Sequence, residues 1–405
     1  MAKRKVKRIK KVVKSSAQAS VSKKAVSKKT ASNKETPPVK LTTKDKKTLT
    51  SIVGLADSVA KTAKVGRAPN VDIPSRSLSN VRFNKTQKIV EMGGNKNKRE
   101  LFNLSQAKSF MQTVLVGSGC KKLIEQGKTT SIRGLYYMLK HKIGQTKENT
   151  FEEQSDCDPI IEDVEVTLDS LREELHLYAS NRGNMMGDIT LIDNGVELNC
   201  SRVGRNGYSI PSIVEPEMVQ FGKTKAKFIL HVEKDTVFSR FVEDEFWKKH
   251  NCLLTHGSGQ PPRGVRRLLN RMHKELKLPI YCLLDNDPWG YYIYSVIKQG
   301  SINLAYESQR MAIPAARFMG LRSKDYDRCG LSSSVQIKLS DTDKKRAKQI
   351  ASYPWFENKK PWQKEIDMMI SNDFKLEVEA LISLDISYVT EEYVPTRLQD
   401  RDFLD

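Results

Sequence analysis

Two carboxylates, Asp285 and Asp287, directly follow the continuous apolar run of residues 280–284. Such a run is typical of a strand that is buried on both faces of a parallel sheet. Side chains two residues apart leave a strand on the same side, and open α/β sheets bind ligands at the carboxyl ends of their strands. The pair therefore suits a hard divalent cation such as Mg²⁺. In isolation, however, a surface turn explains the D-x-D pattern better.

A second apolar run supplies a third carboxylate. Residues 227–232 (K-F-I-L-H-V) also have the pattern of a buried strand, and Glu233 follows them. These two strand ends lie about fifty residues apart along the chain, yet they can meet at one edge of a parallel sheet. The sequence thus predicts that Glu233 and the D-x-D pair hold one cation together.

Residues 131–138 (S-I-R-G-L-Y-Y-M) combine a cation with two phenols. Ser131 is a suitable N-cap for a helix, on which Arg133 and Tyr137 lie four residues apart on one face. Arginine there can stabilise a phenolate or bind a phosphate, and tyrosine can attack phosphorus as a covalent nucleophile. Spacing alone favours the simpler interpretation, in which Tyr136, Tyr137 or both are core or DNA-stacking residues.

An arginine-rich segment follows a loop of glycine and proline in residues 255–272 (T-H-G-S-G-Q-P-P-R-G-V-R-R-L-L-N-R-M). Glycine lets a backbone approach a phosphate closely, and arginine binds phosphate through parallel N–H donors. We therefore expect DNA contacts from this segment and from an arginine before a predicted hairpin. The candidates are Arg182, Arg263, Arg266 and Arg267. A solvated basic helix explains the same pattern.

The positive charge of the chain is concentrated at one end. Of the net charge of +21, residues 1–50 contribute +15 and residues 51–100 contribute +6, so the rest is neutral overall. A basic arm favours a polyanion such as nucleic acid, although a nuclear address or a solubilising tail has the same composition. We expect disorder in residues 1–50, which lack aromatic side chains, and partial order at most in residues 51–100.

Several classes of protein are excluded by composition. The sequence has no run of 18 or more apolar residues and no signal-peptide core, which predicts that no membrane is involved. The six cysteines form no C-x-x-C pair and the histidines show no ligand spacing, which argues against a zinc module or a disulfide framework. We expect an intracellular, DNA-associated protein with reduced thiols.

Periodicity predicts an α/β chain in three parts. A basic tail and linker occupies residues 1–100, helices and then a hairpin occupy residues 101–210, and alternating strands and helices occupy residues 211–405. Separate helices are expected at 104–115, 120–126, 132–141 and 158–168. The hairpin is expected in 186–199 around Asn194-Gly195, a type I′ turn signal, so that helices and hairpin together have the layout of a winged helix. We further expect a join at 211–222, a strand at Leu304 and mainly helices in 341–405.

The ordered set of motifs resembles the family of DNA topoisomerase VI A subunits, which includes the meiotic double-strand-break transesterase. The motifs are R-x-x-Y-Y, R-G before the hairpin, V-E-K, G-x-G-Q-P-P-R-x-x-R-R-L-L and L-D-x-D-P-x-G, and the similarity runs from about residue 100 to the last residue. The resemblance implies a CAP-like winged helix followed by a Toprim domain with a Rossmann-like fold. Gly134 stands where the family often has an acid, and Arg182 where lysine is usual.

The resemblance also implies roles for individual residues. Tyr137 matches the family nucleophile and Arg133 its supporting arginine, while Glu233, Asp285 and Asp287 match the Mg²⁺ ligands of the Toprim domain. The implied reaction is a transient double-strand break through 5′-phosphotyrosyl links, which relaxes and decatenates DNA. Each site would be shared across a homodimer.

The sequence lacks the phosphate-binding loop pattern G-x-x-x-x-G-K-S/T. ATP would therefore be bound by a partner, a GHKL-type ATPase B subunit in an A₂B₂ heterotetramer, as in the family. Two alternatives stay open from the sequence. One is a transesterase that breaks DNA without strand passage, and the other is a non-catalytic DNA-binding scaffold. The location would be an archaeal-type nucleoid, or the nucleus of a eukaryote.

Overall fold

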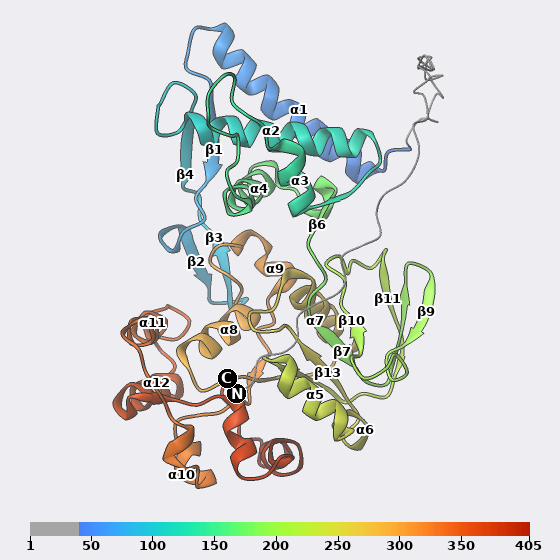
Figure 1. Cartoon of the computed structure of the whole chain (residues 1–405), viewed down its shortest axis with the longest axis vertical. Helices are drawn as coiled ribbons and strands as arrows, with labels where there is room; N and C mark the ends of the chain where they lie inside the picture. The colour runs from blue at the N-terminus through green and yellow to red at the C-terminus, as the bar shows by residue number, and fades with distance from the viewer. Residues whose placement is uncertain (1–39) are drawn as a thin grey trace, which may run out of the picture. The chain divides into compact units, whose positions relative to one another are not determined.

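The computed structural model describes residues 40–405 (Figure 1). Most of the segment predicted to be disordered, residues 1–39, lies outside this range. The prediction for residues 40–100 was wrong, because helix α1 (Thr43–Lys64) opens with a capping box between Thr42 and Asp45. Ile52 of α1 packs into a buried cluster with side chains of α2. The lysine-rich composition hid this narrow apolar face, whose partner lies elsewhere in the sequence.

Short strands follow α1, again in the segment expected to be only partly ordered. Strand β1 (Asn70–Pro74) pairs with β4 (Lys96–Glu100), and β2 (Val81–Asn84) pairs with β3 (Ile89–Met92), both antiparallel. Val71 and Ile73 of β1 are buried against Phe110. These contacts tie residues 70–100 to the helices that come next.

Three helices build the module that carries the two tyrosines. They are α2 (Ala107–Glu125), α3 (Ile132–Leu139) and α4 (Gln154–Leu168). The two helices expected at 104–115 and 120–126 are one helix, since Gly119 does not interrupt it. A Cβ at Gly119 would lie 3.1 Å from side-chain atoms of both Leu135 and Leu139, so this glycine allows α3 to pack closely against α2. We call residues 40–178 the helical module.

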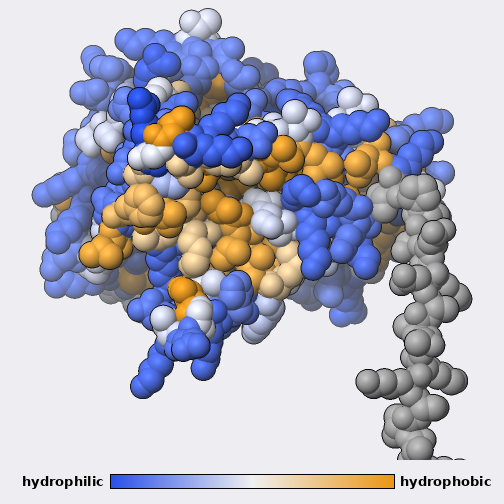
Figure 2. All heavy atoms as spheres, turned by 90° about the horizontal axis from the view of Figure 1, so that it is seen from above, coloured by the Kyte–Doolittle hydropathy of each residue, from blue (hydrophilic) through white to orange (hydrophobic). Residues whose placement is uncertain are grey.

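The surface of the helical module is partly apolar. Figure 2 looks onto the end of the molecule that carries α1 and α2, and it shows apolar side chains gathered among hydrophilic ones. The exposed apolar side chains of this module include Val53, Val65, Phe102, Leu104 and Val114. Within residues 40–405, no helix is long and apolar enough to cross a membrane.

The predicted hairpin is present, but its place in the fold differs from the expectation. Strands β8 (Ile189–Asp193) and β9 (Val196–Asn199) flank Asn194 and Gly195, both with positive φ, as a type I′ turn requires. Strand β11 (Val219–Thr224) pairs with β8, so residues 211–222 are not simply a join. The inward side chains of this sheet share a core with the α/β part that follows. The hairpin is therefore not a wing of the helical module.

A six-stranded sheet organises the rest of the chain, in the order β10-β7-β13-β12-β14-β15. Strands β12, β13, β14 and β15 run parallel, whereas β7 and β10 are antiparallel additions. Their bounds are β7 Asn184–Met186, β10 Tyr208–Ser209, β12 Phe228–Val232, β13 Cys252–His256, β14 Ile280–Leu283 and β15 Arg317–Phe318. The buried strands at 227–232 and 280–284 are confirmed. The strand expected at Leu304 is wrong, because the next strand is β15.

Helices cover both faces of this sheet, as in a doubly wound fold. Ile229 of β12 faces the core formed with α7 (Arg263–Leu276) and α8 (Pro288–Lys298). Its neighbour Leu230 faces the opposite core, formed with α5 (Asp235–Glu243) and α6 (Phe246–Lys249). Both faces of the sheet are thus buried, which explains the unbroken apolar runs in the sequence.

The C-terminal part is mainly helical, as predicted. Its helices are α9 Ser308–Met311, α10 Asp325–Cys329, α11 Asp341–Ala351, α12 Lys360–Asn372 and α13 Val394–Asp400. Two short strand pairs complete the described residues: β5 (Thr130–Ser131) with β6 (Leu177–Tyr178), and β16 (Ile337–Lys338) with β17 (Phe374–Lys375). Leu376, just after β17, bridges to Asn286 at the end of β14.

Candidate active site

Helix α3 sends its two tyrosines into different environments. Ser131 caps the helix as predicted, since its side chain accepts a hydrogen bond from the Gly134 amide. Tyr136 is 6% exposed, and its hydroxyl donates to the Glu152 carbonyl (2.9 Å) and accepts from Lys140 Nζ (2.7 Å). Tyr137 is 61% exposed. Within residues 40–405, the Tyr137 hydroxyl makes no hydrogen bond, so its phenol is free to meet a substrate.

Arg133 lies beside the free phenol. Its guanidinium carbon is 5.9 Å from the centroid of the Tyr137 ring. Both side chains therefore share the face predicted from their spacing. Gly134, between them, has a structural reason: a Cβ there would lie 2.2 Å from the Thr130 hydroxyl oxygen. An acidic side chain at this position would require the Thr130 side chain to shift.

The three predicted metal ligands follow two neighbouring strands. Glu233 follows β12 and Asp285 follows β14, and these strands pair in parallel up to Val232 and Leu283. The Asp285 amide donates to Glu233 Oε2 at 3.3 Å. Burial raises the pKa of Glu233 to about 8, and repulsion from Asp285 and then Asp287 adds to this. The predicted meeting of the two strand ends is thus present in the fold, with the carboxylates close enough to repel one another.

Other groups already occupy part of this carboxylate set. Asp285 Oδ2 lies 3.0 Å from Lys234 Nζ, and Asp285 Oδ1 accepts from the Val378 amide at 2.8 Å. Burial raises the pKa of Asp285 to about 6, against the opposite effect of the Lys234 ammonium. Asp287 caps α8 by accepting from the Gly290 amide. Its pKa is also raised by burial.

The oxygen donors of these carboxylates suit a hard cation, but the carboxylates do not converge on one point. Within residues 40–405, no three His, Cys, Asp or Glu side chains converge as a ready-made metal site. The donors are nonetheless all carboxylate oxygens, which Mg²⁺ prefers, and their mutual repulsion is what a bound cation relieves. Lys234 supplies one positive charge there, and it also lies 3.0 Å from Glu377 and 2.9 Å from Glu379.

The arginines of α7 lie inside the protein rather than on an exposed basic face, and the expectation that Arg263, Arg266 and Arg267 contact DNA stays a prediction. Arg263 is within 2.6 Å of Glu165 and 2.8 Å of Glu307. Arg267 pairs with Glu215 at 2.9 Å. Arg266 is buried, at 4% exposure. The alternative of a solvated basic helix is wrong, because carboxylates distant in sequence pair with these arginines and the helix is largely buried.

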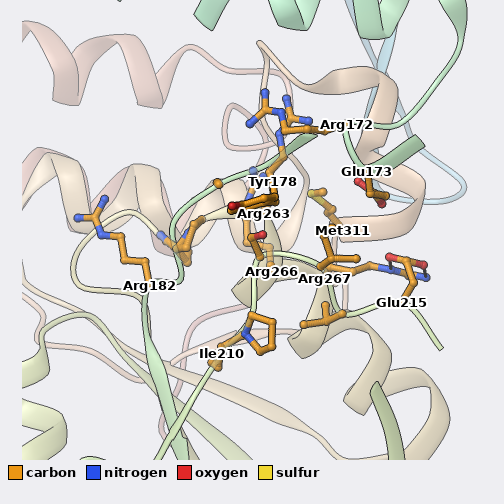
Figure 3. A pocket seen from close by; sticks show the side chains of 18 of the residues that line it. Arg172, Glu173, Tyr178, Arg182, Ile210, Glu215, Arg263, Arg266, Arg267 and Met311 are labelled. Atoms are coloured by element: carbon orange, nitrogen blue, oxygen red, sulfur yellow. Dashed lines mark hydrogen bonds and ion pairs between the residues drawn. The ribbon is translucent and has the colours of Figure 1, made fainter. Parts of the chain in front are cut away.

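Arg182 alone among the four predicted DNA-contact residues is exposed. Its Nη2 atom donates to the Ser258 carbonyl at 2.7 Å, which links the segment before β7 to the glycine loop after β13. Figure 3 shows Arg182 at one side of a cluster that includes Arg263 and Arg266. The structure thus separates one outward arginine from three inward ones.

Family models match most of the described chain, from residue 108 to residue 398. Residues 108–177 match "Type IIB DNA topoisomerase", residues 181–225 match "All-beta domain in DNA topoisomerase VI alpha subunit", and residues 228–398 match the Toprim domain shared by Spo11 and the topoisomerase 6 A subunit. The chain is 38% identical over 376 residues to the A subunit of type 2 DNA topoisomerase 6 of Pyrococcus abyssi, which covers 91% of this chain and 98% of the relative. The chain belongs to the family of topoisomerase VI A subunits. Its members are the DNA-cleaving subunits of type IIB topoisomerases.

More distant members of this topoisomerase VI family are similar over most of their length. The A3 subunit of DNA topoisomerase 6 of Oryza sativa subsp. indica is 30% identical over 347 residues, covering 86% of this chain and 76% of the relative. The match to an all-β segment agrees with the packing of the hairpin outside the helical module. The resemblance to this family and the order of N-terminal type IIB domain and Toprim domain are confirmed.

Sequence reasoning missed the lysines of both clusters. Lys140 bonds the buried Tyr136, and Lys234 lies among the carboxylates of the topoisomerase VI Toprim edge. Lys375 Nζ is 3.9 Å from Asp287. The signal for Lys234 was in the sequence, as the last letter of V-E-K directly after a strand. Nothing local could have indicated Lys375, which lies 88 positions after Asp287.

Proposed function

We propose that this chain is the DNA-cleaving subunit of an ATP-dependent type IIB topoisomerase, with Tyr137 as its nucleophile. The observation that carries the proposal is the contrast within α3. The Tyr136 hydroxyl has two partners in a buried setting, whereas the Tyr137 hydroxyl is exposed and has none within residues 40–405. A nucleophile has to reach a phosphorus atom on a large polymer, and of the two only Tyr137 has its hydroxyl already exposed.

In the proposed reaction, the Tyr137 phenol oxygen attacks a backbone phosphorus of DNA. The new bond joins the tyrosine to the 5′ phosphate, and the bond to the 3′ oxygen breaks. That oxygen takes up a proton in place of the one lost by the phenol, so no charge accumulates overall. One phosphodiester replaces another, so the reverse reaction reseals the strand. Arg133, 5.9 Å from the ring, would hold the phosphate and offset its negative charge.

Glu233, Asp285 and Asp287 would hold Mg²⁺, which when bound stabilises charge on the phosphate and the leaving oxygen. For Asp285 to offer both oxygens toward a cation, Lys234 has to leave Oδ2, 3.0 Å away. Lys234 would stay paired with Glu377 and Glu379, since both already contact its ammonium. A bound Mg²⁺ would offset the charge of the three carboxylates, while Lys234 would offset the charge of Glu377 and Glu379.

The assembly that we propose has two copies of this chain. Tyr137 lies on the exposed side of α3, whose buried side packs in the core of the helical module. The carboxylates follow strands of the sheet, which has separate cores. Pairing the tyrosine of one copy with the carboxylates of the other would give two equivalent sites, one per DNA strand. A GHKL-type B subunit in an A₂B₂ assembly would bind the ATP. The apolar surface near α1 and α2 in Figure 2 is of the kind that marks protein interaction sites.

The test of the nucleophile is a denaturant-resistant adduct between the chain and radiolabelled DNA. Tyr137→Phe should abolish the adduct, because the phenol oxygen is the attacking atom. Tyr136→Phe is the matched control: it removes two hydrogen bonds in the core, so it should lower stability by about 1–2 kcal/mol while adducts still form. Loss of the adduct in Tyr136→Phe with retention in Tyr137→Phe would overturn the assignment.

Strand passage is tested separately from cleavage. The chain is purified together with a candidate ATPase partner, and relaxation of supercoiled plasmid is measured with and without ATP. ATP-dependent relaxation supports the topoisomerase, whereas cleavage without relaxation supports the transesterase alternative. In the cell, we propose that the protein is associated with DNA, in a nucleoid or a nucleus.

A further inference from the structure

A cavity of about 310 Å³ lies beside the first turn of α7. Its walls come from that turn, from residues 177–182 at the end of the helical module and from residues 210–215. Figure 3 shows Arg263, Arg266 and Tyr178 gathered around it, with Arg182 on one side and Glu215 on the other. It contains neither Tyr137 nor any carboxylate of the proposed metal site. The volume is at the lower end of the range of ligand pockets and can hold a small group with its water molecules.

The charge of Arg266 is the unusual feature of this cavity. Arg266 is 4% exposed and lines the cavity, yet within residues 40–405 its guanidinium makes no hydrogen bond and no ion pair. Its Nε atom is buried and without a partner. Burial lowers the pKa of Arg266 to about 10; attraction from Glu307 opposes this effect, and repulsion from Arg263 adds to it. A buried guanidinium without partners costs several kcal/mol unless an anion or water satisfies it.

The neighbouring charges do not satisfy Arg266, because they satisfy one another. Arg267 holds Glu215, and Arg310 holds both Glu173 and Glu307. Each acid of the cavity wall, Glu162, Glu173 and Glu215, thus pairs with an arginine other than Arg266. The guanidinium of Arg266 is left facing the open volume.

A second feature also favours a negative charge there. Helix α7 has 14 residues and begins after Pro262, whose side chain makes no capping hydrogen bond. The first turn therefore leaves the amides of residues 263–265 without a partner among the described residues. Helix N-termini attract anions through such amides and through the helix dipole. Arg266 lies in the same turn, so side chain and backbone act on the same volume.

We propose that this cavity binds a phosphate-type anion, with Arg266 as its principal partner and Arg182 at its edge. The anion would complete the hydrogen bonds of Arg266 and cap α7. Because the walls come both from the helical module and from the sheet region, binding would also stabilise the junction between them. The proposal is independent of the cleavage reaction, and it would stand if the nucleophile were assigned wrongly.

The first experiment measures thermal unfolding of the full chain in inorganic phosphate and in chloride at equal ionic strength. We expect phosphate at 10 mM to raise the unfolding midpoint by about 1–3 °C relative to chloride. Arg266→Met removes the charge and keeps most of the side-chain volume, so the midpoint should no longer respond to phosphate. Arg82→Met, which removes an exposed arginine of β2, is the matched control and should respond like the unmodified chain.

Two outcomes overturn the proposal. One is an equal midpoint in phosphate and chloride for the unmodified chain. The other is an unchanged phosphate response in Arg266→Met. If Arg266→Met does not fold, Arg266→Lys keeps the charge but loses the paired donors, and its phosphate response should be weaker than that of the unmodified chain. An equal response in Arg266→Lys would also contradict the proposal.

A second measurement identifies the source of the phosphate. If a backbone phosphate of DNA enters the cavity, a short duplex should suppress the phosphate response. Arg266→Met should then lower the slope of log affinity against log salt by about 1. If the cavity takes a free anion, the duplex leaves the response intact and the salt slope is unchanged. Either result identifies the occupant.

Discussion

Helices α3 and α7 both carry motif residues that can bind or attack phosphate, but they place them in opposite environments. Helix α3 buries Leu135, Tyr136 and Leu139 and leaves Tyr137 exposed. Helix α7 buries Arg266 and Arg271 together with its leucines and half-buries its other two arginines, because residues 210–215 and 305–312 cover the side away from the sheet. A motif indicates which reactive or binding side chains are present, whereas packing on the outer side of the helix decides whether those side chains are accessible. Substitutions of the exposed motif residues on α3 should therefore reduce reactivity, and substitutions of the arginines on α7 should reduce stability.

The largest effect is expected at the carboxylates of the proposed cation site. Asp285→Asn or Asp287→Asn removes a carboxylate from the proposed cation site, and we expect cleavage of supercoiled plasmid to fall by about a thousandfold or more. Asp235→Asn is the control, because Asp235 is an exposed carboxylate two residues after Glu233. Cleavage that is equal in Asp285→Asn and Asp235→Asn would remove Asp285 from the site.

On the inward side, Arg263→Ala should destabilise the protein. Although burial raises the pKa of Glu165, Arg263 and Arg172 outweigh this and hold it below its usual value. Without Arg263, Glu165 keeps Arg172 and the Tyr306 hydroxyl, each at 2.6 Å. It loses one of its two arginine partners, so we expect a loss of about 3 kcal/mol in urea unfolding. Arg328→Ala, which breaks an exposed pair with Asp402, should cost less than about 1 kcal/mol. Equal losses would show that the α7 network is no stronger than a surface pair.

A smaller effect is expected when the exposed Arg182 and the paired Arg267 are compared in DNA binding. Arg182→Ala should weaken affinity for duplex DNA a fewfold and lower the salt slope by about 1, with no change in the unfolding midpoint. Arg267→Ala should lower the unfolding midpoint and leave DNA affinity and the salt slope unchanged, because Arg267 pairs with Glu215 and donates to the Arg310 carbonyl. Fluorescence anisotropy at several salt concentrations measures DNA affinity and its salt slope, and a melting curve measures the unfolding midpoint. A change of salt slope in Arg267→Ala would mean that α7 opens when DNA binds.

Local signals in the sequence predicted the elements that frame the site. The apolar runs gave β12 and β14, Asn194-Gly195 gave the hairpin turn, and Ser131 gave the start of α3. Each of these depends on a few consecutive residues. The three carboxylates could be grouped because parallel strands end at one edge.

Long-range pairing could not be predicted in this way. Glu165, a partner of Arg263, and Glu215, the partner of Arg267, lie 98 and 52 residues away along the chain. The sequence of α7 does not indicate these partners. Strand β15 has only two residues, too few for a pattern. Helix α1 was missed because its apolar face is narrow, and α2 supplies the surface that buries it.

The smallest expected effect is a pH dependence of stability that depends on the inward pairs. Burial raises the pKa of Glu215, but hydrogen bonds and charge from Arg267 and Arg310 outweigh it and lower the pKa to about 2. A folded-state pKa below the unfolded one stabilises the protein above the unfolded pKa, and this contribution is lost as pH falls. We therefore expect Glu215→Gln to be about 1–2 kcal/mol less stable than the unmodified chain at pH 6, with the difference shrinking between about pH 4.5 and pH 2. Urea unfolding of both chains across this range measures it. A difference that stays constant with pH would mean that Glu215 contributes by packing rather than by charge, and the contrast between α3 and α7 would then rest on burial alone.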